Sequence, residues 1–136
     1  MMKTKKVSKK IYGNPTSDHL KTMESDSPMI GIDASNIRIR VPPEIKSREE
    51  KSEVRSLLKS LESSENNQEF IKLADEDIVN LFMSFCQENG LYFDKEYYKN
   101  LSSQLRKLIL KLKYRFNRPR PRQTYDRINI KDYKSS

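Results

Sequence analysis

The densest group of side chains able to bind an anion lies toward the C-terminal end, in residues 111–122. This stretch reads Lys-Leu-Lys-Tyr-Arg-Phe-Asn-Arg-Pro-Arg-Pro-Arg, so it holds six cationic residues and no acid. Lysine supplies a mobile point charge and arginine a planar fork of donors, and both suit the oxygens of a phosphate. The two prolines stiffen the backbone, which reduces the entropy lost on binding. The stretch therefore predicts a phosphate-binding site.

The residues that we predict to contact the phosphate are Lys113 and Arg120, with six residues between them. Lys113 falls in the last turn of a predicted helix, and Arg120 lies on the extended segment beyond it. A second register, Lys111 with Arg118, has the same spacing and stays open as an alternative. We predict no catalytic residue, metal ligand or cofactor here, because the stretch offers no nucleophile.

The segment that begins at Lys113 resembles the first signature motif of the type 2 phosphatidic acid phosphatase (PAP2) superfamily. This superfamily includes bacterial acid phosphatases and vanadium haloperoxidases. Its motif is lysine, six residues, arginine and proline, often with an aromatic residue before a repeated Arg-Pro. Phe116 and the doubled Arg-Pro match this pattern, whereas Asn117 stands where glycine is common. The likeness covers roughly residues 68–125 and extends to soluble PAP2-like proteins of tailed bacteriophages. It implies that Lys113 and Arg120 contact phosphate.

Two further motifs of this superfamily are absent from the sequence. One is Pro-Ser-Gly-His, which carries a general acid, and the other is Ser-Arg followed by a nucleophilic histidine. The single histidine, His19, lies far upstream in a segment that we expect to be solvated. The resemblance therefore implies the N-terminal part of a PAP2 domain. We expect it to bind phosphate or a phosphorylated small molecule, and to hydrolyse phosphomonoesters only if a complementary chain completes the domain.

The overall charge leaves a different class of function open. The net charge is +8, from 27 Lys and Arg against 19 Asp and Glu, and it favours polyanionic partners without choosing among them. The alternative is a basic nucleic-acid-binding or virion-associated adaptor protein of a bacteriophage, which contacts phosphates without reading bases. Tyr114 and Tyr125 would then stack on single-stranded bases, although packing is their more ordinary role. In a third interpretation the chain is purely structural and its charges are solvated.

Composition predicts that only part of this 136-residue chain folds. The apolar fraction is 35% and the charged fraction is 34%, which limits the core that the chain can bury. We expect a disordered arm and extended linker over residues 1–43, a helical domain over 44–121 and a tail over 122–136. No apolar run is long enough to span a membrane or to act as a secretory signal, so we expect a cytoplasmic protein with Cys86 reduced and buried.

Apolar spacing predicts an all-α fold with about three helices, which the resemblance makes an incomplete PAP2-like bundle. The first helix is predicted from Glu44 to about residue 63, and the second from Gln68 to about residue 89, with a new start near Asp75. The third begins after Asp94, a favourable N-cap residue, and ends near Phe116 because prolines follow. The neighbouring acids at 75–77 are interpreted as capping residues rather than as metal ligands.

Residues 29–41 do not follow the helical pattern. Ile37-Arg-Ile-Arg-Val41 alternates strictly between apolar and cationic residues, which is the period of a β-strand. This alternation predicts a short strand or hairpin, a single extended segment on another surface, or a loosely ordered linker.

Overall fold

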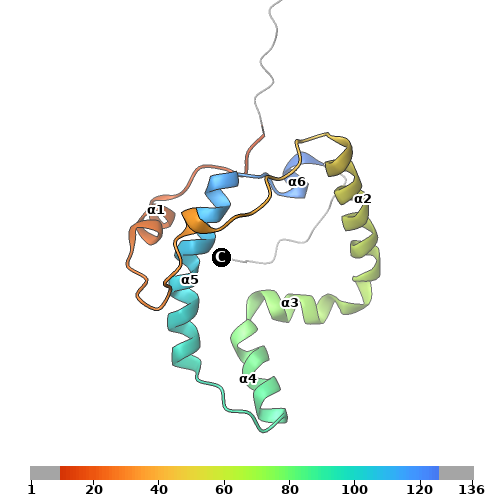
Figure 1. Ribbon diagram of the computed structural model, residues 1–136. Coiled ribbons are helices and arrows are strands. Elements are labelled where there is room, and N and C mark those ends of the chain that lie inside the picture. Colours follow the sequence, from red (N-terminus) through yellow and green to blue (C-terminus); the bar gives the residue numbers. More distant parts are fainter. Residues whose placement is uncertain (1–9, 126–136) are drawn as a thin grey trace, which may run out of the picture.

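The computed structural model describes residues 10–125, and Figure 1 shows that helices make up its regular structure. In chain order the helices are α1 (Ser17–Glu24), α2 (Arg48–Ser63), α3 (Gln68–Glu76), α4 (Ile78–Glu88), α5 (Lys95–Phe116) and α6 (Pro121–Thr124). Two 3₁₀ turns, η1 (Ala34–Asn36) and η2 (Glu65–Asn67), lie between them. The prediction of an all-α fold is confirmed. The predictions for residues 1–9 and 126–136 lie outside the described residues.

The longest helix, α5, has the bounds that local signals predict. The Asp94 carboxylate accepts a hydrogen bond from the Tyr97 N–H at 2.9 Å, as expected of an N-cap. The rings of Phe93 and Tyr98 lie 5.5 Å apart between centroids and form a hydrophobic staple. At the other end Asn117 is left-handed, with φ 46°, and its N–H donates to the Lys113 carbonyl at 2.9 Å.

The second predicted helical region is divided in two at Asp77. Its backbone leaves the helical conformation, with φ −149° and ψ 57°, and its carboxylate caps the N–H of Asn80. A new helix near Asp75 is therefore confirmed. Among residues 10–125 no group of acids, histidines and cysteines has a geometry that suits a metal ion.

Helix α4 ends in a Schellman motif, which the sequence indicates through Gly90. Gly90 has φ 64°, a conformation that glycine adopts without steric cost. The Leu91 N–H donates to the Cys86 carbonyl at 2.8 Å, and the Gly90 N–H donates to the Gln87 carbonyl at 3.3 Å. The Cys86 side chain, predicted to be buried, is only half-buried.

The predicted start of the first helix at Glu44 is too early. Lys46 has φ 67°, so the backbone turns sharply before α2. Ser47 then acts as the N-cap and accepts from the Glu50 N–H at 3.2 Å. The buried Glu50 carboxylate in turn accepts from the Lys46 N–H at 2.5 Å, which ties the turn to the helix.

The N-terminal segment is more ordered than the composition predicts. Residues 17–24 form α1, which packs along α5 (Figure 1). The Thr16 hydroxyl caps this helix by accepting from the His19 N–H at 3.2 Å. Lys107 Nζ donates to the Ser25 carbonyl at 2.5 Å, just after the end of α1. The predicted disordered arm is therefore wrong for residues 17–24, which form a helix within the range 1–43.

Residues 29–41 contain neither a strand nor a hairpin, so that part of the prediction is wrong, and the alternative of a single segment lying on another surface agrees with the structure. The segment lies on α5 as a single strap that includes η1. Ala34, the first residue of η1, is buried. Arg115 fixes the strap by donating to the carbonyls of Ala34 at 2.8 Å and Ile37 at 3.0 Å. Because α5 offers no sheet edge, the strap satisfies backbone groups through a side chain instead of a ladder.

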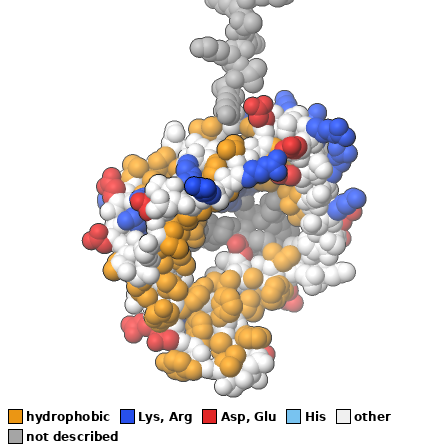
Figure 2. All heavy atoms as spheres, in the orientation of Figure 1, with side chains coloured by type: hydrophobic (Ala, Val, Ile, Leu, Met, Phe, Trp, Pro, Cys, Tyr) orange, Lys and Arg blue, Asp and Glu red, His pale blue; other side chains and the backbone are white. Residues whose placement is uncertain are grey.

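The described residues enclose only a small apolar core. Ala34, Val54 and Leu110 are its buried hydrophobic members. Figure 1 shows α2 standing apart from α5, with α3 leading back from its far end to α4, so these helices form an open arc. Figure 2 shows hydrophobic side chains gathered openly over α3 and α4. Much of the apolar surface in this part of the chain therefore stays in contact with solvent.

Candidate anion-binding site

The last turn of α5 and the start of α6 bring the basic stretch into a compact bend. Asn117 stops α5 in the left-handed conformation, and the chain then runs extended to Arg120. Pro121 opens α6, where its fixed φ suits the first helical position. The Arg120 N–H donates to Gln123 Oε1 at 2.7 Å, which holds the bend closed. Lys113 and Arg120 consequently lie on the two sides of one short turn.

Both predicted phosphate ligands point to the ring of Tyr12. The Lys113 ammonium nitrogen lies 4.4 Å from the ring centroid, and the Arg120 guanidinium carbon lies 5.6 Å from it. These are cation–π contacts, which contribute roughly 0.5–1 kcal/mol each at partly exposed sites. Among residues 10–125 neither cation forms an ion pair with an acid. The structure therefore places the two positive charges together.

Backbone hydrogen bonds position Tyr12 beneath these cations. Its N–H donates to the Asn117 carbonyl at 3.0 Å, and its own carbonyl accepts from Gln123 Nε2 at 3.0 Å. The Gly13 N–H donates to Asn117 Oδ1 at 3.2 Å. Hydrogen bonding to Lys113, together with the charges of Lys113 and Arg120, holds the pKa of the Tyr12 phenol below its usual value. The lowered pKa reflects the positive potential of the site.

The histidine also belongs to this neighbourhood, contrary to the prediction that it is solvated. His19 Nδ1 is hydrogen-bonded to the Tyr114 hydroxyl at 2.7 Å, and the two rings lie 5.7 Å apart. Tyr114 in turn lies 5.9 Å from the ring of Tyr12. Partial burial raises the pKa of the Tyr114 phenol. We call Tyr12, His19, Lys113, Tyr114 and Arg120 the basic aromatic cluster.

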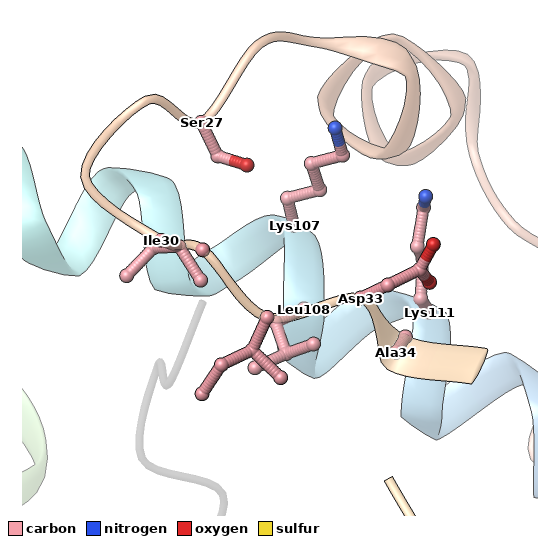
Figure 3. Close-up of a pocket in the computed structure, with 9 residues that line it drawn as sticks. Ser27, Ile30, Asp33, Ala34, Lys107, Leu108 and Lys111 are labelled. Atoms are coloured by element: carbon pink, nitrogen blue, oxygen red, sulfur yellow. The ribbon is translucent and has the colours of Figure 1, made fainter. Parts of the chain in front are cut away.

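The alternative register, Lys111 with Arg118, is separated by the fold. Arg118 forms an ion pair with Glu53 of α2. Lys111 instead lines a separate pocket of about 290 Å³ with Lys107 and Asp33 (Figure 3). Lys111 and Arg118 therefore face different parts of the molecule, and the structure brings Lys113 and Arg120 together in their place.

The charged residues of the pocket in Figure 3 have a structural role, because they lie where the strap is held on α5. Asp33 accepts a hydrogen bond from the Ser35 N–H at 2.9 Å and so caps η1. That hydrogen bonding, and to a lesser extent the charges of Lys111 and Lys107, lowers the pKa of Asp33. A carboxylate beside the two lysines disfavours the entry of an anion.

Both tyrosines proposed for base stacking have protein partners. Tyr114 contacts Tyr12 and His19, and the Tyr125 hydroxyl donates to the buried Glu50 carboxylate at 2.7 Å. Packing is therefore the role that the structure gives them.

Comparisons with protein families, with curated proteins and with solved structures found no match for this chain. Within residues 10–125 no helix is both long enough and apolar enough to cross a membrane.

Sequence reasoning missed Tyr12 and His19, because both were assigned to a disordered arm. A local signal for α1 was present. Thr16 is a favourable N-cap residue, and Asp18 places an acid in the first turn of the helix. No local signal indicates that this helix docks on the end of α5, since Gly13 and Asn117 are 104 residues apart.

Proposed function

We propose that this chain binds a phosphate group between Lys113 and Arg120, as the phosphate-binding part of a PAP2-like phosphatase. The convergence of these two cations on Tyr12, with no acidic partner among residues 10–125, is the observation that supports the proposal. When phosphate binds, Lys113 or Arg120 exchanges its cation–π contact with Tyr12 for a charge-assisted hydrogen bond to a phosphate oxygen. The hydrogen bond is the stronger of the two interactions. The ligand is inorganic phosphate or a phosphorylated small molecule.

Hydrolysis requires more than these two cations. Phosphoryl transfer through a covalent intermediate requires a nucleophile in line with the leaving group. His19 is the one histidine of the sequence, and among residues 10–125 its ring contacts Tyr114 and neither Lys113 nor Arg120. We therefore assign phosphate binding to this chain and the reacting groups to a complementary chain.

Isothermal titration calorimetry with inorganic phosphate tests the binding step. Lys113→Ala and Arg120→Ala each remove a charge-assisted contact of about 1.5–3 kcal/mol, which corresponds to a loss of affinity of about 10- to 100-fold. Lys99→Ala and Arg106→Ala are matched controls, because both residues are exposed on α5, and they should leave the affinity within about twofold. Equal losses in all four variants would contradict a defined site.

Two further measurements separate the competing functions. The isolated chain should not turn over p-nitrophenyl phosphate, and turnover that disappears in His19→Ala would overturn the assignment of the reacting groups to another chain. A single-stranded oligonucleotide distinguishes nucleic-acid binding. On that interpretation the affinity falls steeply with salt, and the control variants lose as much as Lys113→Ala does.

A further inference from the structure

Helices α3 and α4 form an arm whose apolar side chains have no cover in the described part of the chain. Phe70, Leu73, Phe82 and Phe85 are 60%, 47%, 44% and 56% exposed. Figure 2 shows hydrophobic side chains exposed over both helices. The arm is also acidic, since residues 68–88 hold five acids and one lysine, a net charge of −4. We call α3 and α4 with residue 77 between them the acidic arm.

A groove of complementary character lies along the C-terminal half of α5. Its volume is about 660 Å³, and its apolar lining includes Ile39, Val41, Ile109, Leu112 and Phe116. Ile109 and Val41 are 58% and 73% exposed. We call this hollow the α5 groove.

The groove lies on a basic helix and has a small excess of positive charge. Helix α5 carries seven cationic residues and one acid, a net charge of +6. At the groove itself, Arg40 pairs with Glu49 and Arg118 pairs with Glu53, which leaves Lys113 without an acidic partner there. One molecule thus carries both surfaces. The acidic arm is an exposed apolar surface with acids around it, and the α5 groove is an exposed apolar hollow on a basic helix. Such surfaces attract each other through both the hydrophobic effect and opposite charge.

Helix α2 holds the start of the arm away from the groove of its own chain. Helix α2 begins beside the groove, where Glu49 and Glu53 line it, and it leads directly into η2 and α3. A helix rises about 1.5 Å per residue, so the 16 residues of α2 hold α3 roughly 24 Å from the groove. Figure 1 shows α2 as a straight spacer with α3 at its far end.

We propose that the acidic arm of one copy of this chain binds the α5 groove of a second copy. A two-fold axis then allows the second arm to bind the first groove, so both apolar surfaces are covered in a closed dimer. The contact joins two different surfaces and is made twice.

Analytical ultracentrifugation of the full chain over a range of concentrations tests this assembly. The wild-type chain should sediment as a dimer that dissociates on dilution. An arm variant, Phe70→Ser with Phe85→Ser, and a groove variant, Ile109→Ser, should both sediment as monomers. Leu20→Ser is the matched control, because Leu20 is 46% exposed on α1, and it should stay dimeric. Circular dichroism establishes that each variant keeps its helix content.

Charge reversal provides a second set of variants that removes no apolar contact. Glu69 and Glu76 line a hollow on α3 together with Phe70 and Leu73. Glu69→Lys with Glu76→Lys should weaken dimerisation by tenfold or more at low salt, and added salt should narrow the difference from wild type. An unchanged dimer in this variant would overturn the proposed pairing of charges.

Mixing the two classes of variant identifies which surfaces meet. A fluorescently labelled arm variant should bind the groove variant saturably, because that pair keeps one intact groove and one intact arm. Neither variant should bind itself. If the groove variant alone still dimerises, the arms pair with each other and the proposal is wrong. It is also wrong if the wild-type chain is monomeric throughout, or if the mixture does not associate even at concentrations far above those at which the wild type dimerises.

Discussion

At the scale of single residues, the fold separates cations that look equivalent in the sequence. Lys113 and Arg120 converge on Tyr12, while Arg118 pairs with Glu53 and Arg115 holds the strap. Lysine and arginine in a basic stretch therefore have distinct roles that depend on what lies opposite each side chain. The convergence at Tyr12 is the one that makes a phosphate site plausible on electrostatic grounds.

The titration of Tyr12 reports directly on this arrangement. Because Lys113 and Arg120 stabilise the phenolate, Tyr12 should ionise below its usual pKa of 10.0, and Lys113→Met should raise its pKa. The depressed pKa means that the folded state binds fewer protons than the unfolded state just below pH 10.0. The resulting stabilisation is present above the unfolded pKa and is lost as the pH falls through the folded pKa.

Ultraviolet absorbance of tyrosinate measures this titration. The difference between the wild-type chain and Tyr12→Phe isolates the Tyr12 phenol, and the same difference is then measured in the Lys113→Met background. Lys99→Met serves as the control, since Lys99 is exposed on the same helix. A Tyr12 curve that is the same with and without Lys113 would contradict the arrangement.

At the scale of elements, the left-handed end of α5 holds the parts of the site together. Asn117 combines φ 46° with two roles in holding the N-terminal segment: its carbonyl accepts from Tyr12 and its side chain accepts from Gly13. A left-handed conformation costs most side chains roughly 1–2 kcal/mol, and asparagine and glycine are the residues that adopt it most readily. Asparagine is therefore one of the few residues that can end α5 in this conformation.

Substitutions at Asn117 separate the two contributions. Asn117→Ala should lower the free energy of unfolding by about 1–3 kcal/mol, because it adds backbone strain and removes the acceptor of the Gly13 N–H. Asn117→Gly removes the acceptor only, so its loss should be about 1 kcal/mol smaller. Urea denaturation followed by circular dichroism gives both values. An alanine variant as stable as the glycine variant would show that the left-handed conformation is not required.

At the scale of the whole molecule, the fold is open and its buried apolar core is small. Three hydrophobic residues are buried among those described, whereas Phe70, Phe85 and Ile109 are each more than half exposed. A chain that buries so little gains little from the hydrophobic effect on its own. Association through the acidic arm and the α5 groove would supply the missing burial.

This reasoning predicts that thermal stability depends on protein concentration. Because a dimer is favoured by mass action, the Tm of the wild-type chain should rise as its concentration increases. The arm variant, Phe70→Ser with Phe85→Ser, should show a lower Tm that does not change with concentration. Scanning calorimetry at several concentrations measures both. A wild-type Tm independent of concentration would contradict coupling between folding and association.

The sequence by itself determined the elements whose signals are local. Asp94 and the staple at Phe93 mark the start of α5, Asp77 starts α4 and Gly90 ends it, because caps and left-handed turns depend on residues within one helical turn. Spacing left two registers open, Lys113 with Arg120 and Lys111 with Arg118, and the resemblance favoured the first.

Only the tertiary structure decided which residues surround that pair. Tyr12 and His19 reach it because residues 10–24 dock on the end of α5, and contacts across 95 or more residues leave no periodic trace in a sequence. The sequence left the strap open between a strand, an extended segment on another surface and a linker for the same reason. Alternation indicates two different sides, and the partner that Arg115 provides lies 78 or more residues away. Local interactions therefore determine where the helices begin and end, and long-range packing determines which residues lie together at the site.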